Sequence, residues 1–509
     1  MQITLISPPQ NFSKTQETAG VVPPLGLCYL AASLDSERYR VKIIDAVAER
    51  YKQVFTWQDH MLRGMSFDEI LKAVPPDTRV VGISNLYTFA FMVAGEIARR
   101  IKQKYPEVII VFGGAHPTVM TQQTMARPEV DFVVLSEGEY TFKDLLQAIE
   151  RGGGWEDIDG LAYRKGGEIV VNPKTKFVHD LDQIPFPRRD LLPMENYFRA
   201  REPHGSANRL RWTTMIATRG CPYGCTFCNT PQIWQRRWRS RSPKNVVDEI
   251  LQLQKDYGIE EIHFEDESLT TNPKWVLDFA RELKQRNVDI IWQTSNGVRA
   301  ESITEEALDL MIEAGCTQVT VAAESGSPRI LKDVIKKRLD LETVRQAVRL
   351  AGKKRVFIAC YFMLGLPDEQ ISDVLKSISL AVKLAIYGAD EVVFSVFSPL
   401  PGSKLLERLI QEGKVRVDDH FFNGLTPHGD LFVSKSYSDY ISDRQVILLK
   451  YSGYLAFYLT KLIFHPFKVL RSIRNVAFGI QEIKTERALR TWILRLLGKE
   501  HSFVKEKTA

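Results

Sequence analysis

The chain has 509 residues, 44% of them apolar and 26% charged, so it can bury large cores and is expected to form two or three domains. Its apolar runs are too short for the roughly 18 residues of a transmembrane span, and its first residues indicate a strand rather than a signal peptide. Three of the six cysteines, Cys28, Cys316 and Cys360, are scattered singly, which excludes a disulfide framework and indicates a cytoplasmic protein.

The net charge of +6 is unevenly placed along the chain. Residues 444–509 hold 13 Lys/Arg and 4 Asp/Glu, a balance of +9, which leaves −3 for residues 1–443. The body is therefore neutral to acidic and the tail is basic.

Residues 1–150 alternate short apolar runs with helical stretches. The runs are Ile3–Ile6, Val41–Ile44, Val80–Ile83, Val108–Phe112 and Phe132–Leu135. Runs of this length, bounded by turn residues, are typical of buried parallel strands. The alternation predicts an α/β domain with a doubly wound, flavodoxin-like sheet of five strands.

Small and polar residues follow these runs, where a doubly wound sheet binds its ligand. They are Ser7, Pro8, Pro9, Asp45, Ser84, Asn85, Gly113, Gly114, Glu137, Gly138 and Glu139. A single Gly-Gly pair is a weak signal and indicates a plain turn. The whole set predicts a ligand-binding edge at which backbone can approach a bulky group closely.

Residues 151–212 are expected to form a connector, with a hairpin over 161–171. From 213 to about 415 the strand–helix alternation returns with longer spacing, which predicts a partial TIM-like barrel whose functional residues follow its strands. Residues 416–509 are expected to form a C-terminal helical extension.

Three cysteines lie close together after the first run of this second region. Cys221, Cys225 and Cys228 form C-x3-C-x2-C. Structural zinc normally takes four Cys or His ligands, so three thiolates are too few to close such a site. A cubane iron–sulfur cluster on three thiolates keeps one iron open for an external ligand.

With Phe227 before the last cysteine, this motif resembles the signature of the radical S-adenosylmethionine (SAM) superfamily. The resemblance implies a 4Fe-4S cluster whose open iron binds SAM. Residues at the family's contact positions for SAM are Phe227, Glu265, Asp266, Asn296, Arg299, Glu324, Ser325, Gly365 and Pro399. From the residues alone, a helix cap is the usual use of the three carboxylates Glu265, Asp266 and Glu267.

The N-terminal set resembles the cobalamin-binding domain that precedes many radical SAM enzymes. It comprises Pro-Pro, Pro-Leu-Gly-Leu at 24–27, Gly-Gly-x-His-Pro-Thr at 113–118 and Ser-Glu-Gly-Glu at 136–139. The D-x-H-x-x-G motif that supplies an axial histidine in methionine-synthase-type domains is missing. We therefore expect base-off cobalamin, with His116 stabilising a turn.

Together the resemblances predict a cobalamin-dependent radical SAM C-methyltransferase. Its substrate is expected to be a small hydrophobic or polycyclic intermediate, an isoprenoid lipid or a tetrapyrrole, attacked at an unactivated carbon. An electron donor such as flavodoxin or ferredoxin is the implied partner. Residues 194–212 also resemble the anaerobic magnesium-protoporphyrin monomethyl ester cyclase branch, so an oxidative cyclase is the alternative, and a cobalamin-binding sensor is an alternative of another class.

Two basic segments remain. Arg236, Arg237, Arg239 and Arg241 have too little aromatic interleaving for a nucleic-acid groove, so no nucleic acid is expected, and they are interpreted as a carboxylate clamp or a solvated face. The tail mixes aromatics with lysines, which favours either helices packed on the barrel or peripheral contact with the inner face of a membrane.

Overall fold

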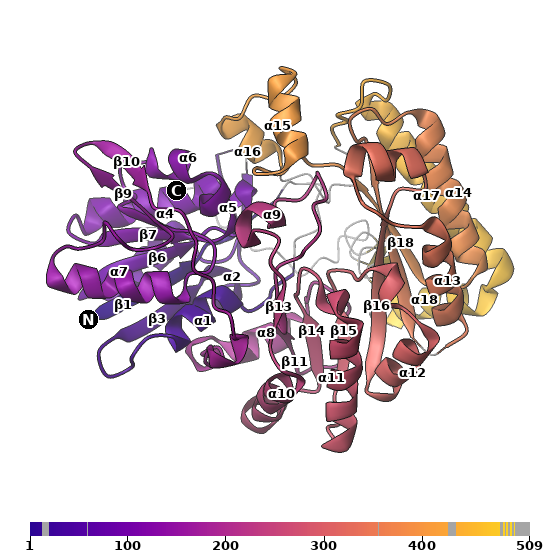
Figure 1. The fold of residues 1–509 in the computed structure, drawn as a ribbon, viewed down its shortest axis with the longest axis horizontal. Coiled ribbons are helices and arrows are strands. Elements are labelled where there is room, and N and C mark those ends of the chain that lie inside the picture. Colours follow the sequence, from indigo (N-terminus) through magenta and orange to yellow (C-terminus); the bar gives the residue numbers. More distant parts are fainter. Residues whose placement is uncertain are drawn as a thin grey trace.

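The computed structural model describes residues 1–12, 20–58, 60–354, 356–425, 434–478, 482–483, 485–486, 489–490 and 493. Two parallel sheets flanked by helices stand side by side, and the last helices cover the outer edge of the second sheet (Figure 1). Most of the predicted basic tail after residue 478 lies outside the described residues.

The first sheet has the strand order β10-β9-β8-β7-β6-β1-β3. Its strands are β1 (Gln2–Ser7), β3 (Arg40–Asp45), β6 (Thr78–Ser84), β7 (Ile109–Gly113), β8 (Phe132–Val134), β9 (Leu161–Lys165) and β10 (Glu168–Val171). The five predicted strands are parallel, and their order is that of flavodoxin, with the switch point between β1 and β6. The hairpin β9–β10, expected in the connector, pairs antiparallel with β8 and extends this sheet.

Helices cover both faces of the first sheet, as a doubly wound fold requires. One face packs against α1 (Leu25–Ala32) and α7 (Glu139–Arg151), and the other against α3 (Phe67–Ala73) and α4 (Phe91–Lys104). The ends of these helices follow from local chemistry. A capping box of Ser66 and Glu69 starts α3, and Gly152, with a φ of +79°, ends α7.

Smaller elements complete this region. They are β2 (Gln10–Phe12), β4 (Val54–Trp57) and β5 (His60–Arg63), which form a three-stranded sheet, and α2 (Ala46–Glu49), α5 (Ala115–Val119), α6 (Thr121–Met125) and α8 (Met194–Ala200).

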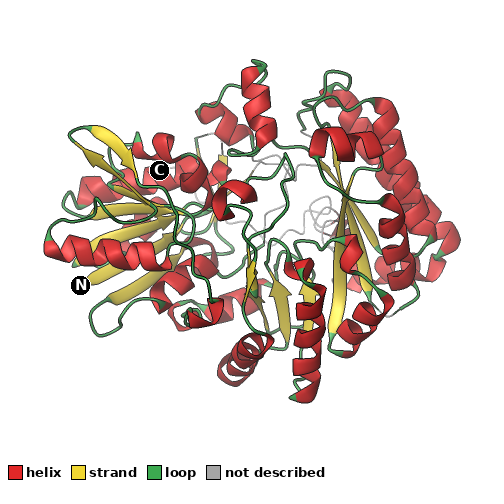
Figure 2. Ribbon diagram, in the orientation of Figure 1, coloured by secondary structure: helices red, strands yellow, loops and turns green. Residues whose placement is uncertain are grey.

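The second sheet is a six-stranded parallel sheet, ordered β11-β14-β15-β16-β17-β18, which confirms the partial barrel (Figure 2). Its strands are β11 (Trp212–Met215), β14 (Glu261–Phe264), β15 (Ile291–Thr294), β16 (Cys316–Glu324), β17 (Phe357–Leu364) and β18 (Glu391–Val396). Its helices are α10 (Pro243–Tyr257), α11 (Pro273–Gln285), α12 (Glu305–Glu313), α13 (Leu341–Gly352) and α14 (Ile371–Ile386).

Alternate side chains of these strands face the helices or the lumen of the barrel. Phe264 and Trp292 pack on Phe279 of α11 and therefore point outward. The side chains at the alternate positions, Glu261, His263 and Gln293, point inward. There the Gln293 Nε2 donates to the Glu261 carboxylate at 2.7 Å. Residues 204–208 add further polar contacts, so this end of the lumen is filled.

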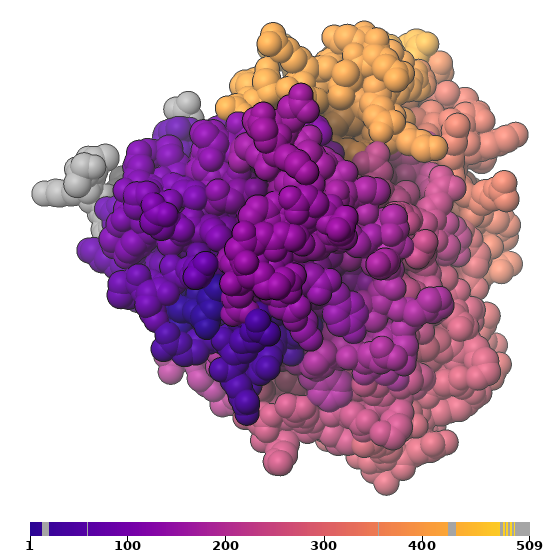
Figure 3. Space-filling model, turned by 60° about the vertical axis from the view of Figure 1, so that its left-hand side comes forward, coloured from indigo at the N-terminus to yellow at the C-terminus, as the bar shows by residue number. Residues whose placement is uncertain are grey.

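The C-terminal extension joins the two regions and covers one edge. The helices α15 (Lys404–Gln411) and α16 (Asp419–Gly424) lie beside the N-terminal domain, where α16 contacts α4 (Figure 3). The helices α17 (Asp443–Phe464) and α18 (Pro466–Phe478) follow, and α17 packs on α14 and β18.

Candidate functional site

The cysteine loop begins directly after β12 (Thr218–Arg219) and is fixed by backbone contacts. Gly220 has a φ of +84°, and a Cβ there would lie 2.0 Å from the Arg237 carbonyl oxygen, so the turn requires glycine. Further along, Thr226 donates through Oγ1 to the Val334 carbonyl at 2.6 Å and through its amide to Ile335 at 3.0 Å. Both acceptors belong to a π-helical turn, Ile330–Ile335. The loop is therefore held on a rigid support.

The three thiols on this loop are half-buried and free, and they lie near one another. Burial is the main cause that raises their pKa values, that of Cys225 to about 11. Neighbouring thiols add to the rise for Cys221 and Cys225. Among the described residues, no three Cys, His, Asp or Glu side chains converge closely enough to hold a single metal ion. A cationic metal group beside the thiols would favour their thiolate form. By contrast Cys28, Cys316 and Cys360 are fully buried in the cores.

Two of the carboxylates after β14 hold the strand that leads into this loop. Asp266 accepts from the Ala217 amide at 3.1 Å and the Thr218 Oγ1 at 2.6 Å, and burial raises its pKa to about 7. Glu267 accepts from the Gly220 amide at 3.1 Å. Their neighbour Glu265 instead lies 3.0 Å from the Nδ1 of His204.

A second group of side chains approaches the loop from β16 and the turn after it. Glu324 has a φ of +62°, a strained conformation for this residue type that is concentrated at functional sites, and it pairs with the buried Lys337 at 2.9 Å. Lys337 and Glu324 both influence the pKa of the Cys225 thiol electrostatically. Arg299 lies over the ring of Tyr223, 4.0 Å from its centroid.

The remaining SAM-contact residues predicted from the sequence differ in exposure. Asn296 is exposed and Phe227 is half-buried, whereas Ser325, Gly365 and Pro399 are buried. The Oγ of Ser325 lies 3.3 Å from that of Ser377.

The predicted edge of the first sheet divides into an accessible and a buried part. Ser7, Pro8, Ser84, Gly113, Gly114 and Gly138 are half-buried along the carboxyl ends of the strands, whereas Pro9 and Asn85 are buried. Gly114 has a φ of +116°, and its Cβ would lie 2.8 Å from the Asn85 carbonyl oxygen. Glycine is needed there for the protein's own backbone.

Asp45 lies in the buried part, against the connector. Its carboxylate caps α2 and accepts from the hydroxyl of Tyr197 on α8 at 2.5 Å, and burial raises its pKa to about 6.

Glu137 and Glu139 also lie in the buried part, where they bind the barrel. Glu137 pairs with Arg219 at 2.7 Å and with Arg239 at 3.1 Å, and Glu139 pairs with Arg219 at 2.6 Å. Arg241 pairs with Glu249 instead, so Arg239 and Arg241 belong to buried ion pairs rather than to the predicted carboxylate clamp. We call the group Glu137, Glu139, Arg219 and Arg239 the inter-domain joint.

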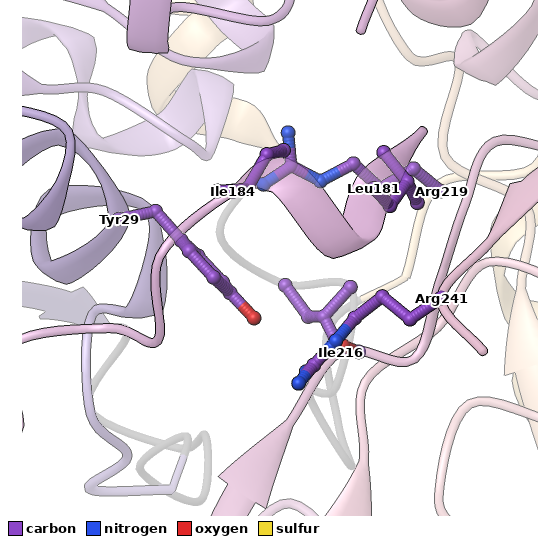
Figure 4. Close-up of a pocket in the computed structure, with 6 residues that line it drawn as sticks. All are labelled: Tyr29, Leu181, Ile184, Ile216, Arg219 and Arg241. Carbon is purple, nitrogen blue, oxygen red and sulfur yellow. Dashed lines mark hydrogen bonds between the residues drawn. The ribbon is translucent and has the colours of Figure 1, made fainter. Parts of the chain in front are cut away.

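A cavity of about 10 Å³ adjoins this joint, which is room for about one water molecule (Figure 4). It is lined by Tyr29, Leu181, Ile184, Ile216, Arg219 and Arg241. Arg219 lies over the Tyr29 ring, 5.1 Å from its centroid. The joint therefore fixes the residue two positions before Cys221 against the first domain.

The structure adds Tyr87, which the sequence did not single out. It follows β6, is 46% exposed, and stacks on Phe89 with the ring centroids 5.2 Å apart. Burial raises its pKa to about 12, and the charge of Glu265 from the barrel adds to the rise. Tyr87 therefore lies within electrostatic reach of the barrel.

The missed residues share one property: their roles arise between segments far apart in the chain. Tyr87 follows Ser84 and Asn85 in the predicted edge, and Arg219 precedes the cysteine motif, so proximity to a motif was the only signal. Lys337 carried no signal in the sequence, because its pairing with Glu324 forms only in the folded chain.

His116 is 1% exposed, with its Nδ1 3.1 Å from the Thr88 hydroxyl. Its ring packs on Phe91 and Phe422, and burial lowers its pKa to about 3. This placement agrees with a turn-stabilising imidazole.

Two family models match the chain: the B12 binding domain over residues 15–146 and the radical SAM superfamily over residues 215–381. An uncharacterised methyltransferase of Pyrococcus horikoshii is 33% identical over 94% of this chain and 98% of its own. The cytidylyl-2-hydroxyethylphosphonate methyltransferase of Streptomyces wedmorensis is 32% identical over 78% and 80%.

Comparisons at lower sequence identity also match most of this chain. The anaerobic magnesium-protoporphyrin IX monomethyl ester cyclase of Rubrivivax gelatinosus is 27% identical over 82% of this chain and 72% of its own. The solved structure of the radical SAM methyltransferase TsrM from Kitasatospora setae, with cobalamin and a 4Fe-4S cluster bound, superposes with a TM-score of 0.64 at 19% identity, over 82% of this chain and 76% of that one. This likeness shows a shared fold.

Proposed function

The chain belongs to the radical SAM enzymes that carry an N-terminal B12-binding domain, and we propose that it methylates an unactivated carbon of a hydrophobic or polycyclic biosynthetic intermediate, an isoprenoid lipid or a tetrapyrrole. Its cofactors are a 4Fe-4S cluster, SAM and cobalamin. The observation that carries the proposal is the inter-domain joint, in which Arg219, two positions before Cys221, pairs with Glu137 and Glu139 at the carboxyl edge of the first sheet.

When bound, these groups supply one-electron cleavage of SAM and a methyl group on cobalt, which is what a carbon without a lone pair requires. The chain's own residues provide position. Cys221, Cys225 and Cys228 would hold the cluster on a loop that the Asp266 and Glu267 carboxylates brace. Residues proposed to contact SAM are Phe227, Glu265, Asp266, Asn296, Arg299, Glu324, Ser325, Gly365 and Pro399.

The cobalamin side is proposed to be the carboxyl edge of the first sheet, with Ser7, Pro8, Ser84, Gly113 and Gly114 as its accessible members. The joint keeps this edge and the cysteine loop in one relative position, because Arg219 pairs with Glu137 and Glu139 in a buried setting. Held in this way, the two cofactors can act on one substrate without diffusion between sites.

The inner wall of the barrel at β17 and β18 favours an apolar substrate. Phe394 and Tyr454 pack edge to face outside the sheet, so the alternate positions Tyr361, Met363 and Val393 point inward, and all three are half-buried. A small molecule bound against this wall would contact mainly apolar surface. A flavodoxin or ferredoxin is proposed as the electron donor, and the cytoplasm as the location.

The test is an anaerobic assay of the reconstituted enzyme with SAM bearing a labelled methyl group and extracts of a deletion strain. A product heavier by one CH2 unit that carries the label supports the methyltransferase. A product lighter by hydrogen and without label supports the oxidative cyclase, the second candidate, which the similarity to the Rubrivivax cyclase favours. Cobalamin binding with no turnover of SAM would support a sensor instead.

A further inference from the structure

The helix α17 buries two lysines together with Val446 and Phe457, and it exposes a row of leucines. Its inner face holds Lys450, which is 4% exposed, and Lys461, which is 2% exposed. The Lys461 Nζ donates to the Asp390 carbonyl oxygen at 2.6 Å. At Gly453 the helix lies so close to the barrel that a Cβ would lie 2.8 Å from the ring of Phe394 on β18.

The outer faces of α17 and α18 are apolar and unusually exposed. The two helices hold eleven of the 23 exposed large apolar side chains in the described residues, and Phe467, Phe478 and Ile463 reach 84%, 78% and 74% exposure. We call the following set the apolar ridge: Leu448, Leu455, Leu459, Leu462, Ile463, Phe464, Phe467, Leu470, Ile473 and Phe478. The spacing of 448, 455, 459 and 462 places these four on one helical face.

We propose that the apolar ridge docks this enzyme onto an anionic lipid bilayer. The ridge side chains are aliphatic or phenyl groups without hydrogen-bonding atoms, which suits hydrocarbon better than a polar protein surface. Exposed Arg444 and Arg474 lie on the same two helices, and residues 444–509 carry +9, or 9 − 2 = +7 without the buried Lys450 and Lys461, against −3 for the rest of the chain. This charge complements acidic headgroups, to which each basic residue is attracted by roughly 1 kcal/mol.

The contacts between α17 and the barrel decide whether this helix crosses the bilayer or lies along its surface. By length and composition α17 could cross a membrane, with a mean hydropathy of 1.3 over its most apolar window. Its inner face, however, packs on α14 and β18 through Lys450, Gly453 and Lys461. Crossing would strip both lysines from this packing and place them in hydrocarbon, which is costly. The helix therefore lies along the surface, with the barrel attached to its inner side.

The experiment is flotation of the full-length protein with vesicles of phosphatidylcholine and phosphatidylglycerol, at low and high salt. The ridge variant is Leu455→Gln with Phe467→Gln, and the control is Leu210→Gln with Ile410→Gln, two exposed apolar side chains elsewhere. We expect the wild type and the control to float at low salt, and the ridge variant to bind about tenfold more weakly or worse. Vesicles of phosphatidylcholine alone should bind the wild type less.

Three results would overturn the proposal. They are a wild type that stays at the bottom of the gradient at every salt concentration, a ridge variant that floats like the control, and a wild-type dimer that the ridge variant converts to monomers in sedimentation. Thermal unfolding of both variants should match the wild type, because all four side chains are exposed. The readout is binding rather than turnover, so it is independent of the methyltransferase assay.

Discussion

The cysteine loop of the barrel and the carboxyl edge of the first sheet differ in what their polar groups do. On the barrel side the three thiols remain half-buried and without a covalent partner, while Asp266 and Glu267 hold the loop from behind. On the side of the first sheet, Asp45, Glu137 and Glu139 are buried and engaged with other parts of the protein. Charged residues beside a motif therefore act mainly as support here, and the accessible groups are the three thiols, Ser7, Pro8, Ser84 and the glycines.

The largest effect is expected at the accessible thiols. Cys221→Ala, Cys225→Ala or Cys228→Ala should each abolish cluster binding and SAM cleavage, because the remaining two thiolates cannot hold the cluster. Iron content and release of 5′-deoxyadenosine after anaerobic reconstitution measure this. Cys28→Ala, Cys316→Ala and Cys360→Ala are the controls and should keep their iron. Zinc in place of iron in the wild type would contradict the expectation.

The next largest effect concerns the inter-domain joint. Arg219→Ala would leave the carboxylates of Glu137 and Glu139 buried without their main cation, which should lower the free energy of unfolding by about 3–5 kcal/mol. Chemical denaturation measures this, and Arg40→Ala, which removes an exposed pair with Asp77, should cost at most about 1 kcal/mol. Equal losses in the two variants would mean that the joint does not hold the domains.

Asp45 gives a smaller, pH-dependent effect. Its folded pKa of about 6 lies above its ordinary value of 3.8, so the folded state binds the proton more tightly and stability falls as the pH rises from about 4 to 6. Asp45→Asn removes this titration. The stability of the wild type relative to Asp45→Asn should therefore decrease across that window, by up to about 1.4 kcal/mol per pH unit. Parallel stability curves for the two proteins would contradict the assignment.

The smallest effect is expected at His116. Its ring is enclosed by Phe91 and Phe422, so His116→Ala should leave the base-off absorption spectrum of bound cobalamin unchanged. Electron paramagnetic resonance of the cob(II)alamin form should show no nitrogen splitting from a protein ligand. Such splitting in the wild type, lost in the variant, would identify His116 as a cobalt ligand.

Much of the fold was predictable because apolar runs and turn residues are local signals. The five predicted parallel strands of the first sheet occur where the apolar runs predict them, and the predicted strand–helix alternation of the barrel is confirmed. The hairpin β9–β10 was recognised but not its partner β8, since pairing depends on tertiary contacts. The domain boundaries at 150, 212 and 415 remain predictions.

The site was predictable to the extent that its chemistry lies within one segment. The cysteine motif is such a case. The joint was not, because Glu137 and Arg219 are separated by 82 positions and meet only in the folded chain. The burial of Lys450 and Lys461 on α17 was equally hidden, because the sequence shows lysines among leucines but not which of them face the barrel.

The central claim is that the cysteine loop and the edge of the first sheet serve one space. Electron paramagnetic resonance of the protein carrying both a reduced cluster and cob(II)alamin tests this most directly, since both centres are then paramagnetic. We predict a spectrum broadened or split by interaction between the two spins, which is lost in Cys225→Ala and in protein without cobalamin. A spectrum equal to the sum of two isolated centres would contradict the account.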